Sequence, residues 1–166
     1  MNVNYQRHFL KEREVKSILE GVSRELHLDL KQIFEGEVKM ELVEADFAEI
    51  FLIRNRPLLF KRGNKIFPSL IFGEISELIP KVVVDMGAVP HVCNGADIMA
   101  PGIVRFEGEF SEGDLVFVVD EEYNKNIAVG QTALRLEAAK KASRGIVIHN
   151  IHFVGDKIWN FIKKWT

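Results

Sequence analysis

The chain has 166 residues, which is long enough to bury a core as one domain or as two small ones. Hydrophobic residues make up 47% of it and charged residues 28%, a composition that excludes a disordered chain. The formal net charge at pH 7 is -2, so the summed field of the molecule does not attract phosphate. Any binding of nucleic acid must therefore come from a local basic patch.

Cysteine content and hydropathy bear on the compartment. Cys93 is the only cysteine, so no disulfide forms within the chain and nothing points to an oxidising compartment. No apolar run approaches the roughly 18 residues of a membrane-spanning helix, and residues 1–8 lack the apolar core of a signal peptide. We therefore expect a cytoplasmic protein that is neither exported nor embedded in a membrane.

The first part of the chain predicts a helix followed by strands. Apolar residues from Lys11 to about Leu28 fall at steps of three and four, which is one stripe of an amphipathic helix. Residues 38–67 form short β-rich pieces, and the Arg-Gly-Asn-Lys sequence of residues 62–65 indicates a hairpin turn. We expect a small helix-and-sheet unit here.

A second helical pattern marks the predicted domain boundary. The apolar residues between Leu70 and Ile79 have helical spacing, and Pro80 ends the segment. We place the boundary there, which gives a first domain over residues 1–79 and a second domain over residues 80–166.

The second part of the chain predicts a small β-barrel. Residues 82–84 have the pattern of a buried strand, and residues 88–94 that of a short helix, which Gly95 ends in a left-handed conformation. The tail from Asp156 to Trp165 has apolar residues at helical spacing, and we expect it to pack on the barrel. Short strands separated by turns, with a second short helix among them, are typical of a barrel and are predicted at residues 102–107, 114–119, 126–133 and 145–149, with the helix at 136–142.

The stretch from Val82 to Ile103, VVVDMGAVPHVCNGADIMAPGI, resembles the opening signature of PUA domains. Later pieces resemble that family's turns and strands in the expected order, namely Glu112-Gly113-Asp114, Ile127-Ala128-Val129-Gly130, Arg144-Gly145 and the run from His152 to Trp159. That last run, together with an N-terminal pre-domain, is similar to the malignant T-cell-amplified-sequence family and its archaeal relatives. The resemblance implies an α+β protein, with an N-terminal helix-and-sheet pre-PUA domain followed by a PUA pseudo-barrel and a C-terminal helix.

Several residues of the signature have a direct physical interpretation. Asp85 is placed to accept amide hydrogen bonds from the first turn of the helix, Gly87 permits a tight entry, and Ala88 lets the helix lie close to the barrel. Gly95 and Gly102 bracket a loop whose backbone can approach a ligand closely. An RNA phosphate or an unstacked terminal base can meet exposed amides there.

The resemblance also implies which residues face RNA. In PUA domains the glycine loop, the preceding helix and the neighbouring strand form the RNA-facing surface. The alternative interpretation is that this loop only closes the barrel. The residues implied here are Gly95, Ala96, Asp97, Met99, Ala100, Pro101, Gly102 and Ile103, with Arg105 on the adjoining strand as the nearest cation.

Basic side chains contribute most of the affinity for RNA phosphates, and they form three local groups in this chain. The group that follows the second short helix, Lys140, Lys141 and Arg144, belongs to the predicted RNA-binding set. For each group taken alone, a solvated surface is the competing interpretation, and the sequence does not show whether the groups converge. The other two groups are Arg54, Arg56, Lys61, Arg62 and Lys65 in the first half, and Lys163 with Lys164 in the tail.

Catalytic and metal-binding patterns give no positive indication. His91 and Cys93 stand two apart on a helix and point to nearly opposite sides, and His149 and His152 need a turn to share a side. No phosphate-binding loop or nucleophile loop is present. Pseudouridine synthases and transglycosylases carry a PUA domain beside a catalytic domain, for which the preceding residues are too few. We expect no enzyme activity, no metal and no cofactor.

The expected function is that of a non-catalytic RNA-binding protein. The resemblance implies work with the small ribosomal subunit and initiator transfer RNA in translation initiation, reinitiation and recycling, beside a partner of the density-regulated type. An accessory subunit that targets an RNA-modification enzyme, and a protein-interaction module without RNA binding, are the alternatives. Arg135 departs from the family pattern, because the second short helix would usually begin with a Ser or Thr cap.

Overall fold

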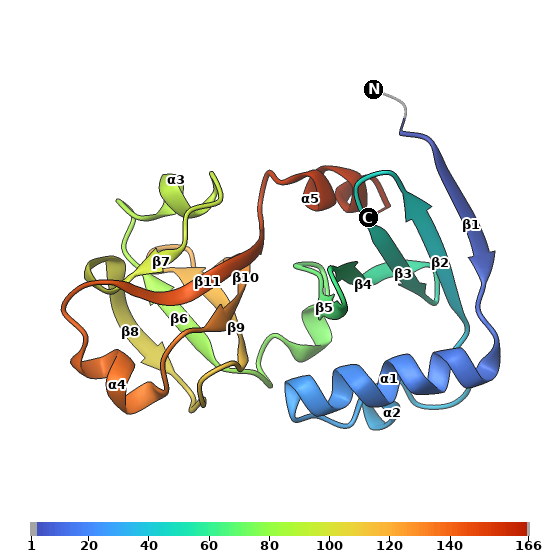
Figure 1. The fold of residues 1–166 in the computed structure, drawn as a ribbon, viewed down its shortest axis with the longest axis horizontal. Helices are drawn as coiled ribbons and strands as arrows, with labels where there is room; N and C mark the ends of the chain where they lie inside the picture. The colour runs from blue at the N-terminus through green and yellow to red at the C-terminus, as the bar shows by residue number, and fades with distance from the viewer. Residues whose placement is uncertain (1–2, 166) are drawn as a thin grey trace. The chain divides into compact units, whose positions relative to one another are not determined.

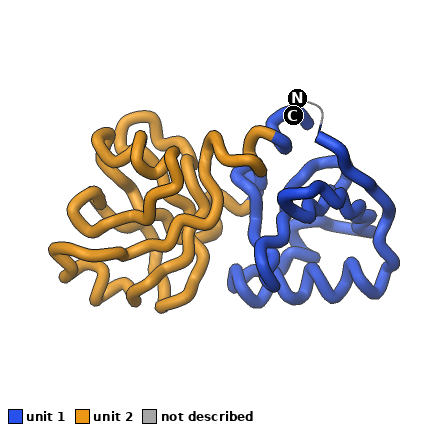
Figure 2. The backbone as a smooth tube through the Cα atoms, turned by 45° about the horizontal axis from the view of Figure 1, so that its top comes forward, with its two compact units in different colours: residues 1–74, 161–166 blue, residues 75–160 orange. Residues whose placement is uncertain are grey.

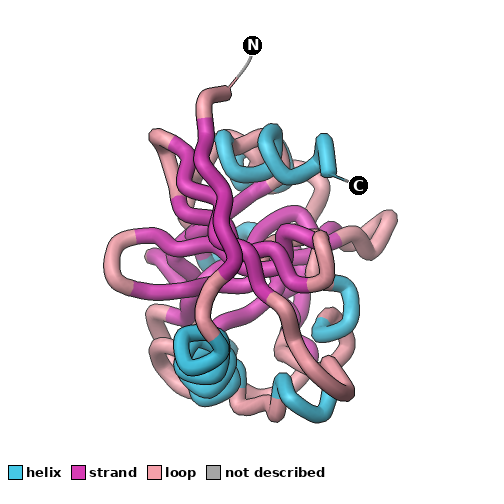
Figure 3. The backbone as a smooth tube through the Cα atoms, turned by 90° about the vertical axis from the view of Figure 1, so that its right-hand side faces the viewer, coloured by secondary structure: helices cyan, strands magenta, loops and turns pink. Residues whose placement is uncertain are grey.

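The structure, a computed structural model, describes residues 3–165. Met1 and Asn2, which begin the segment without a signal-peptide pattern, lie outside the described residues. Backbone contacts divide the chain into two compact units, one of residues 1–74 with 161–166 and one of residues 75–160 (Figure 2). Strands predominate over helices in the described chain (Figure 3), and none of its helices is long and apolar enough to cross a bilayer.

The first unit contains a five-stranded antiparallel sheet and the helices α1 and α2 (Figure 1). The sheet order is β1-β2-β3-β4-β5, so each strand pairs with the next strand in the chain. The helix predicted for residues 11–28 and the hairpin predicted at residues 62–65 are both confirmed. The elements are β1 Tyr5–Phe9, α1 Glu12–Leu26, α2 Leu30–Ile33, β2 Met40–Ala45, β3 Glu49–Ile53, β4 Arg56–Arg62 and β5 Lys65–Pro68.

Helix α1 forms because its two ends are satisfied and one of its faces is apolar. At the start, Glu14 Oε1 accepts a hydrogen bond from the Lys11 amide at 3.2 Å. At the end, His27 adopts a left-handed conformation with φ of 56°. The apolar stripe predicted from the sequence packs into the core of the unit, and its buried residues are Val15, Leu19, Val22 and Leu26.

The prediction of a helix between Leu70 and Ile79 is wrong. The structure has a run of turns there, with only a short 3-10 helix, η1 Gly73–Ile75. The Phe72 and Leu78 amides donate to carbonyl groups three residues back, as in turns and not as in an α-helix. Phe72 is fully buried whereas Leu78 is 53% exposed. A spacing of three between apolar residues suits successive turns as well as a helix, which explains the error.

The second unit is a six-stranded mixed sheet that curls into a half-barrel (Figure 1). The sheet order is β7-β11-β10-β9-β6-β8, in which β6 runs parallel to β9 and the other pairs are antiparallel. This confirms the predicted α+β fold class with a pre-domain and a pseudo-barrel. The elements are β6 Lys81–Val84, α3 Val89–Val92, β7 Ile98–Met99, η2 Ala100–Gly102, β8 Ile103–Glu107, β9 Leu115–Asp120, β10 Asn126–Thr132, α4 Leu136–Lys141, β11 Ile146–Phe153 and α5 Lys157–Ile162. The last two residues of α5, and η3 Lys163–Trp165 that follows, group with the first unit.

Small and β-branched residues fill the core of the second unit, which is typical of strands buried on both faces. β11 continues well beyond the strand predicted at residues 145–149. In its main hydrophobic cluster, the residues with no exposed surface are Val82, Val84, Val116, Val118, Ala128, Val147 and Ile148. Val83, Phe117, Val119 and Val129 of the same unit are also fully buried.

The end of the tail contacts the first strand of the first unit, which the sequence does not predict. Residues 161–166 group with the first unit, whereas the prediction placed them in a second domain over residues 80–166. The centroid of the Trp165 ring lies 5.8 Å from that of Tyr5 and 5.2 Å from that of Phe161. Tyr5 belongs to β1, a strand that the sequence pattern does not predict, and this strand supplies the surface that the tail covers.

Candidate nucleic-acid interface

The turn after β6 fixes the start of the predicted RNA-facing loop. Asp85 Oδ1 accepts a hydrogen bond from the Ala88 amide at 2.8 Å. The Asp85 amide donates to the Gly102 carbonyl at 2.9 Å, which joins the two ends of the loop. A Cβ atom at Gly102 would lie 3.1 Å from Ala88 Cβ, so this close approach favours glycine. Asp85 thus closes the turn before α3 and is not the N-cap that the sequence predicts, because the N-cap is Ala88. Ala88 lies close to the loop at Gly102.

Gly95 has the predicted left-handed conformation, with φ of 93°, but α3 ends earlier, at Val92, and a turn through Cys93 and Asn94 leads to the glycine. The Gly95 amide donates to the Val92 carbonyl and the Ala96 amide to the His91 carbonyl, each at 3.0 Å, so the last carbonyl groups of the helix are satisfied. A Cβ atom at Gly95 would lie 3.3 Å from the Phe153 ring. The chain thus turns sharply here and lies close to β11.

Strand β7 attaches the next part of the loop to β11. Met99 lies opposite Ile146 in the sheet, and the Ala100 amide donates to the Gly145 carbonyl at 2.9 Å. Met99 is 46% exposed and Ile146 is 40% exposed. These two side chains form a small exposed apolar surface beside the loop.

The Asp97 carboxylate points to β11. Its Oδ1 accepts a hydrogen bond from the Asn150 amide at 2.9 Å, and its Oδ2 lies 3.8 Å from His149 Nδ1. A carboxylate in these contacts braces the loop and offers no attraction to phosphate. The structure therefore gives Asp97 a supporting role within the predicted RNA-facing set.

A cavity of about 390 Å³ lies between β8 and α4. We call it the β8–α4 cavity. It brings together residues that are far apart in the sequence, and Arg105 and Lys140 supply its two cationic groups. Val104 contributes an apolar side chain that is 47% exposed. The lining residues are Ala100, Ile103, Val104, Arg105, Phe106, Ala139, Lys140 and Ala142.

The charge of Arg105 is only weakly engaged inside the protein. Its Nε lies 3.1 Å from Glu107 Oε2, and both side chains are about half exposed. Exposed ion pairs of this kind contribute little free energy, at most about 1 kcal/mol. A phosphate group can therefore compete with Glu107 for the guanidinium, with bidentate geometry.

The other cations of this region follow one another at the end of α4. Lys140 and Lys141 occupy the last turn of the helix, where positive charge is favoured by the helix dipole, and Arg144 follows in the next turn. All three are exposed. Within residues 3–165, none of them forms an ion pair with a carboxylate. Their charges are available to a ligand.

The structure gathers only part of the predicted RNA-binding set into the cavity. Ala100, Ile103, Arg105 and Lys140 line it. The sequence interpretation missed Val104 and Phe106, whose only signal is their position on either side of Arg105 in a strand. The predicted residues that do not line the cavity are Gly95, Ala96, Asp97, Met99, Pro101, Gly102, Lys141 and Arg144.

The basic group of the first half has partners within its own unit. Arg54 donates to the carbonyl oxygens of Phe34 and Glu35 at 2.7 and 2.5 Å. Arg56 forms a bidentate pair with Glu74 at 2.5 and 3.0 Å. The hydrogen bonds from Arg56 outweigh burial and hold the pKa of Glu74 below its usual value. Lys61 and Lys65 lie 3.9 and 4.0 Å from carboxylates of the same unit. These contacts favour the interpretation of a solvated surface for this group.

The buried and half-buried titratable groups of the second unit contact other residues of the protein and do not line the cavity. His152 is fully buried, and its Nδ1 lies 2.8 Å from Asp156 Oδ2. Burial raises the pKa of Asp156, but hydrogen bonding to His152, its charge, and the Trp159 and Phe153 amides together outweigh burial and hold that pKa below its usual value. Burial raises the pKa of the Cys93 thiol. Among the described residues, no group of three His, Cys, Asp or Glu side chains is placed to hold a metal ion.

Known protein families match both units. Residues 80–154 match the PUA domain, and residues 6–72 match the Domain of unknown function DUF1947. The chain is thus a PUA-domain protein whose first unit is a DUF1947 pre-domain.

Relatives match along almost the whole chain. An uncharacterized protein of Methanocaldococcus jannaschii is 39% identical over 162 residues, which cover 94% of this chain and 96% of that protein. Translation machinery-associated protein 20 of Saccharomyces cerevisiae is 27% identical over 140 residues, covering 80% and 77% of the two chains. Malignant T-cell-amplified sequence 1 of Danio rerio is 26% identical over 157 residues, covering 87% of each.

A solved structure agrees with the fold. The crystal structure of a hypothetical protein from Pyrococcus horikoshii OT3 has a TM-score of 0.80 and 34% identity, covering 95% of this chain and 99% of that one. The chain belongs to the PUA-domain family of Malignant T-cell-amplified sequence 1, Translation machinery-associated protein 20 and their archaeal relatives, which confirms the resemblance inferred from the sequence.

Proposed function

We propose that the protein binds RNA through the β8–α4 cavity and the adjoining loop, and that it does so without catalysing a reaction. The observation that carries this proposal is that Arg105 and Lys140 line one cavity together with Val104. Guanidinium and ammonium groups bind phosphate oxygens, and an apolar wall accepts the face of an unstacked base. The PUA domain supports RNA binding as the general function.

Local charge then determines where RNA binds. The molecule carries a formal net charge of -2, so phosphate is attracted only where cations locally outnumber carboxylates. Lys141 and Arg144 extend such a region from Lys140 along the end of α4. The exposed Met99 and Ile146 side chains offer a second apolar surface to an unstacked base.

Translation is the context in which this RNA binding acts. The name of Translation machinery-associated protein 20 supports that role, and the bound RNA is then transfer RNA or the ribosomal RNA of the small subunit. The partner is a protein of the density-regulated type, and the compartment is the cytoplasm.

Crosslinking in cells, followed by sequencing of the attached RNA, tests the function. We expect reads from small-subunit ribosomal RNA or transfer RNA, and co-sedimentation of the protein with small subunits in a lysate gradient. Absence from the small-subunit fractions, together with a stable complex with an RNA-modification enzyme, would favour the accessory-subunit alternative. Absence of any crosslinked RNA would favour a protein-interaction module.

A further inference from the structure

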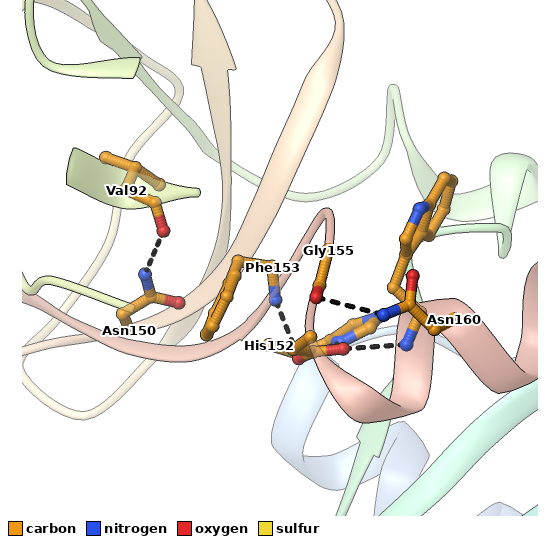
Figure 4. Close-up of polar contacts among 8 residues, drawn as sticks. Val92, Asn150, His152, Phe153, Gly155 and Asn160 are labelled. Atoms are coloured by element: carbon orange, nitrogen blue, oxygen red, sulfur yellow. Dashed lines mark hydrogen bonds and ion pairs between the residues drawn. The ribbon is translucent and has the colours of Figure 1, made fainter. Parts of the chain in front are cut away.

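Asn150 on β11 holds the loop that adjoins the β8–α4 cavity. Its side-chain Nδ2 donates to the Val92 carbonyl at 3.0 Å (Figure 4). The same Nδ2 donates to the Ala96 carbonyl at 2.9 Å. Its backbone amide donates to Asp97 Oδ1 at 2.9 Å. One residue thus contacts the end of α3, the turn at Gly95 and the residue before β7.

The same side chain carries an unsatisfied oxygen. Asn150 Oδ1 is buried and accepts no hydrogen bond from the residues that the structure describes. Burying an acceptor without a partner costs free energy. The two donors of the amide explain why an Asn side chain fits here, because Asp has no donor and Ser has only one. The residue is therefore suited to hold two carbonyl groups of the loop and is poorly suited to a role in core packing alone.

The sheet is irregular at the point where Asn150 lies. Val129 of β10 faces His152, and the next residue, Gly130, faces Asn150, so Ile151 is the extra residue of a β-bulge. A Cβ atom at Gly130 would overlap Ile148 Cγ2 and lie 3.0 Å from the His149 carbonyl oxygen. A bulge redirects a side chain relative to a regular strand. This irregularity is a second feature, independent of the hydrogen bonds, that directs Asn150 toward α3.

We propose that Asn150 is a positioning residue for RNA binding: it fixes the backbone from Val92 to Asp97 and, through β7, the start of the cavity wall at Ala100. This inference rests on the proposed function and names the residue that shapes its site. A loop that is ordered before the ligand arrives does not lose conformational entropy on binding. Asn150 has no direct contact with RNA in this role, because its donors are engaged within the protein.

Asn150→Ala tests the proposal, with Asn160→Ala as the matched control. Asn160 lies in the same unit, and its Nδ2 donates to the Gly155 carbonyl at 3.2 Å and not to a carbonyl of the loop (Figure 4). With the full chain and a structured RNA, we expect Asn150→Ala to raise Kd about tenfold and Asn160→Ala to leave Kd unchanged. The salt dependence of binding stays as in the wild type, because the phosphate contacts remain.

Hydrogen exchange supplies a readout that is independent of RNA. The Gly95 and Ala96 amides are expected to exchange faster in Asn150→Ala, while amides of β9 exchange as in the wild type. If the variant does not fold, Asn150→Ser, which keeps one donor, replaces it and is expected to show an intermediate Kd. Faster exchange with an unchanged Kd would overturn the positioning role while leaving the proposed function intact. A wild-type protein that binds no RNA would overturn both, whatever the exchange rates.

Discussion

Arg105 on β8 and Lys140 on α4 line the same cavity, although β9 and β10 lie between them in the chain. Each cation alone would be an ordinary exposed side chain. Together with an exposed Val104, they form a site with two phosphate-binding groups and an apolar wall. The RNA-binding face of the second unit is therefore defined by tertiary packing around this pair.

The cavity predicts different contributions from two neighbouring lysines. Lys140→Gln is expected to weaken RNA binding and to reduce the slope of log K against log salt by about 0.7 to 0.9, because one phosphate contact is lost. Lys141→Gln makes the same change of charge, but Lys141 does not line the cavity, so its effect on the slope should be smaller. Fluorescence anisotropy at several salt concentrations measures both, and equal slopes would contradict the assignment of the cavity.

Gly95 and Gly145 have the same backbone conformation but different surroundings, so substituting each separates the cost of backbone strain from the cost of a steric contact. Gly95 and Gly145 have φ of 93° and 89°, so alanine at either position is expected to cost about 1 kcal/mol or more of unfolding free energy. A Cβ atom at Gly145 has open space, whereas at Gly95 it meets the Phe153 ring at 3.3 Å. Urea unfolding should therefore show a larger loss for Gly95→Ala than for Gly145→Ala. Equal losses would mean that the Phe153 ring moves aside freely.

The pKa of Asp156 predicts sensitivity to acid. It lies below its usual value, because the contacts with His152 and nearby amides outweigh burial. A carboxyl group with a lowered pKa in the folded state stabilises the protein above its unfolded pKa of about 3.9, and this stabilisation is lost as pH falls through the folded pKa. Asp156→Asn should therefore be less stable than the wild type at pH 7, and the difference should shrink below about pH 4.

Unfolding free energies at pH 7 and at pH 3 provide the check on Asp156. The control variant should change a carboxyl group that makes no hydrogen bond to the backbone, unlike Asp114, whose Oδ2 accepts one from the Ser111 amide. Glu137→Gln is suitable, since this residue is exposed and its only described ion pair, with Arg135, spans 3.9 Å. A difference between Asp156→Asn and the wild type that is the same at both pH values would contradict the assigned pKa.

The aromatic contacts of the tail predict a stabilising role for Trp165. Its ring lies near those of Tyr5 and Phe161, and the Arg7 guanidinium lies 5.7 Å from its centroid. Trp165→Ala is expected to cost about 1 to 3 kcal/mol of unfolding free energy, from lost ring contacts and the lost cation–π contact. Tyr123→Ala removes an aromatic side chain that is 65% exposed and should change stability by less than about 0.5 kcal/mol. Similar losses in both variants would show that the tail contributes no packing energy.

The sequence predicts the local elements that one periodicity or one turn signal determines. Helix α1 has a long apolar stripe, the hairpin at residues 62–65 has its glycine, and Gly95 is left-handed as predicted. Prediction fails where one pattern is compatible with two structures. The apolar spacing between Leu70 and Ile79 is compatible with a helix and with successive turns, and the structure has turns there. Strand β1 escapes prediction because all of its residues are exposed, so it has no apolar alternation.

The candidate site is predicted less completely, because it depends on contacts between distant residues. The resemblance to PUA domains implies the loop and Arg105, but the cavity also needs α4 to place Lys140 opposite β8. Asn150 is a single polar residue in a strand, and no local pattern shows that its amide spans two carbonyl groups of another segment. The pairing of the basic residues in the first unit with carboxylates is equally invisible in the sequence.

RNA binding by a charge-reversed cavity tests the central claim most directly. The measurement is the affinity of the full chain for a structured RNA across a salt titration, for the wild type, for Arg105→Glu with Lys140→Glu, and for Lys61→Glu with Lys65→Glu. The last variant makes the same change of net charge at two residues of the first unit that do not line the cavity. We predict salt-dependent binding that is lost in the cavity variant and retained in the control. Equal loss in both variants, or no binding by the wild type at low salt, would contradict the claim.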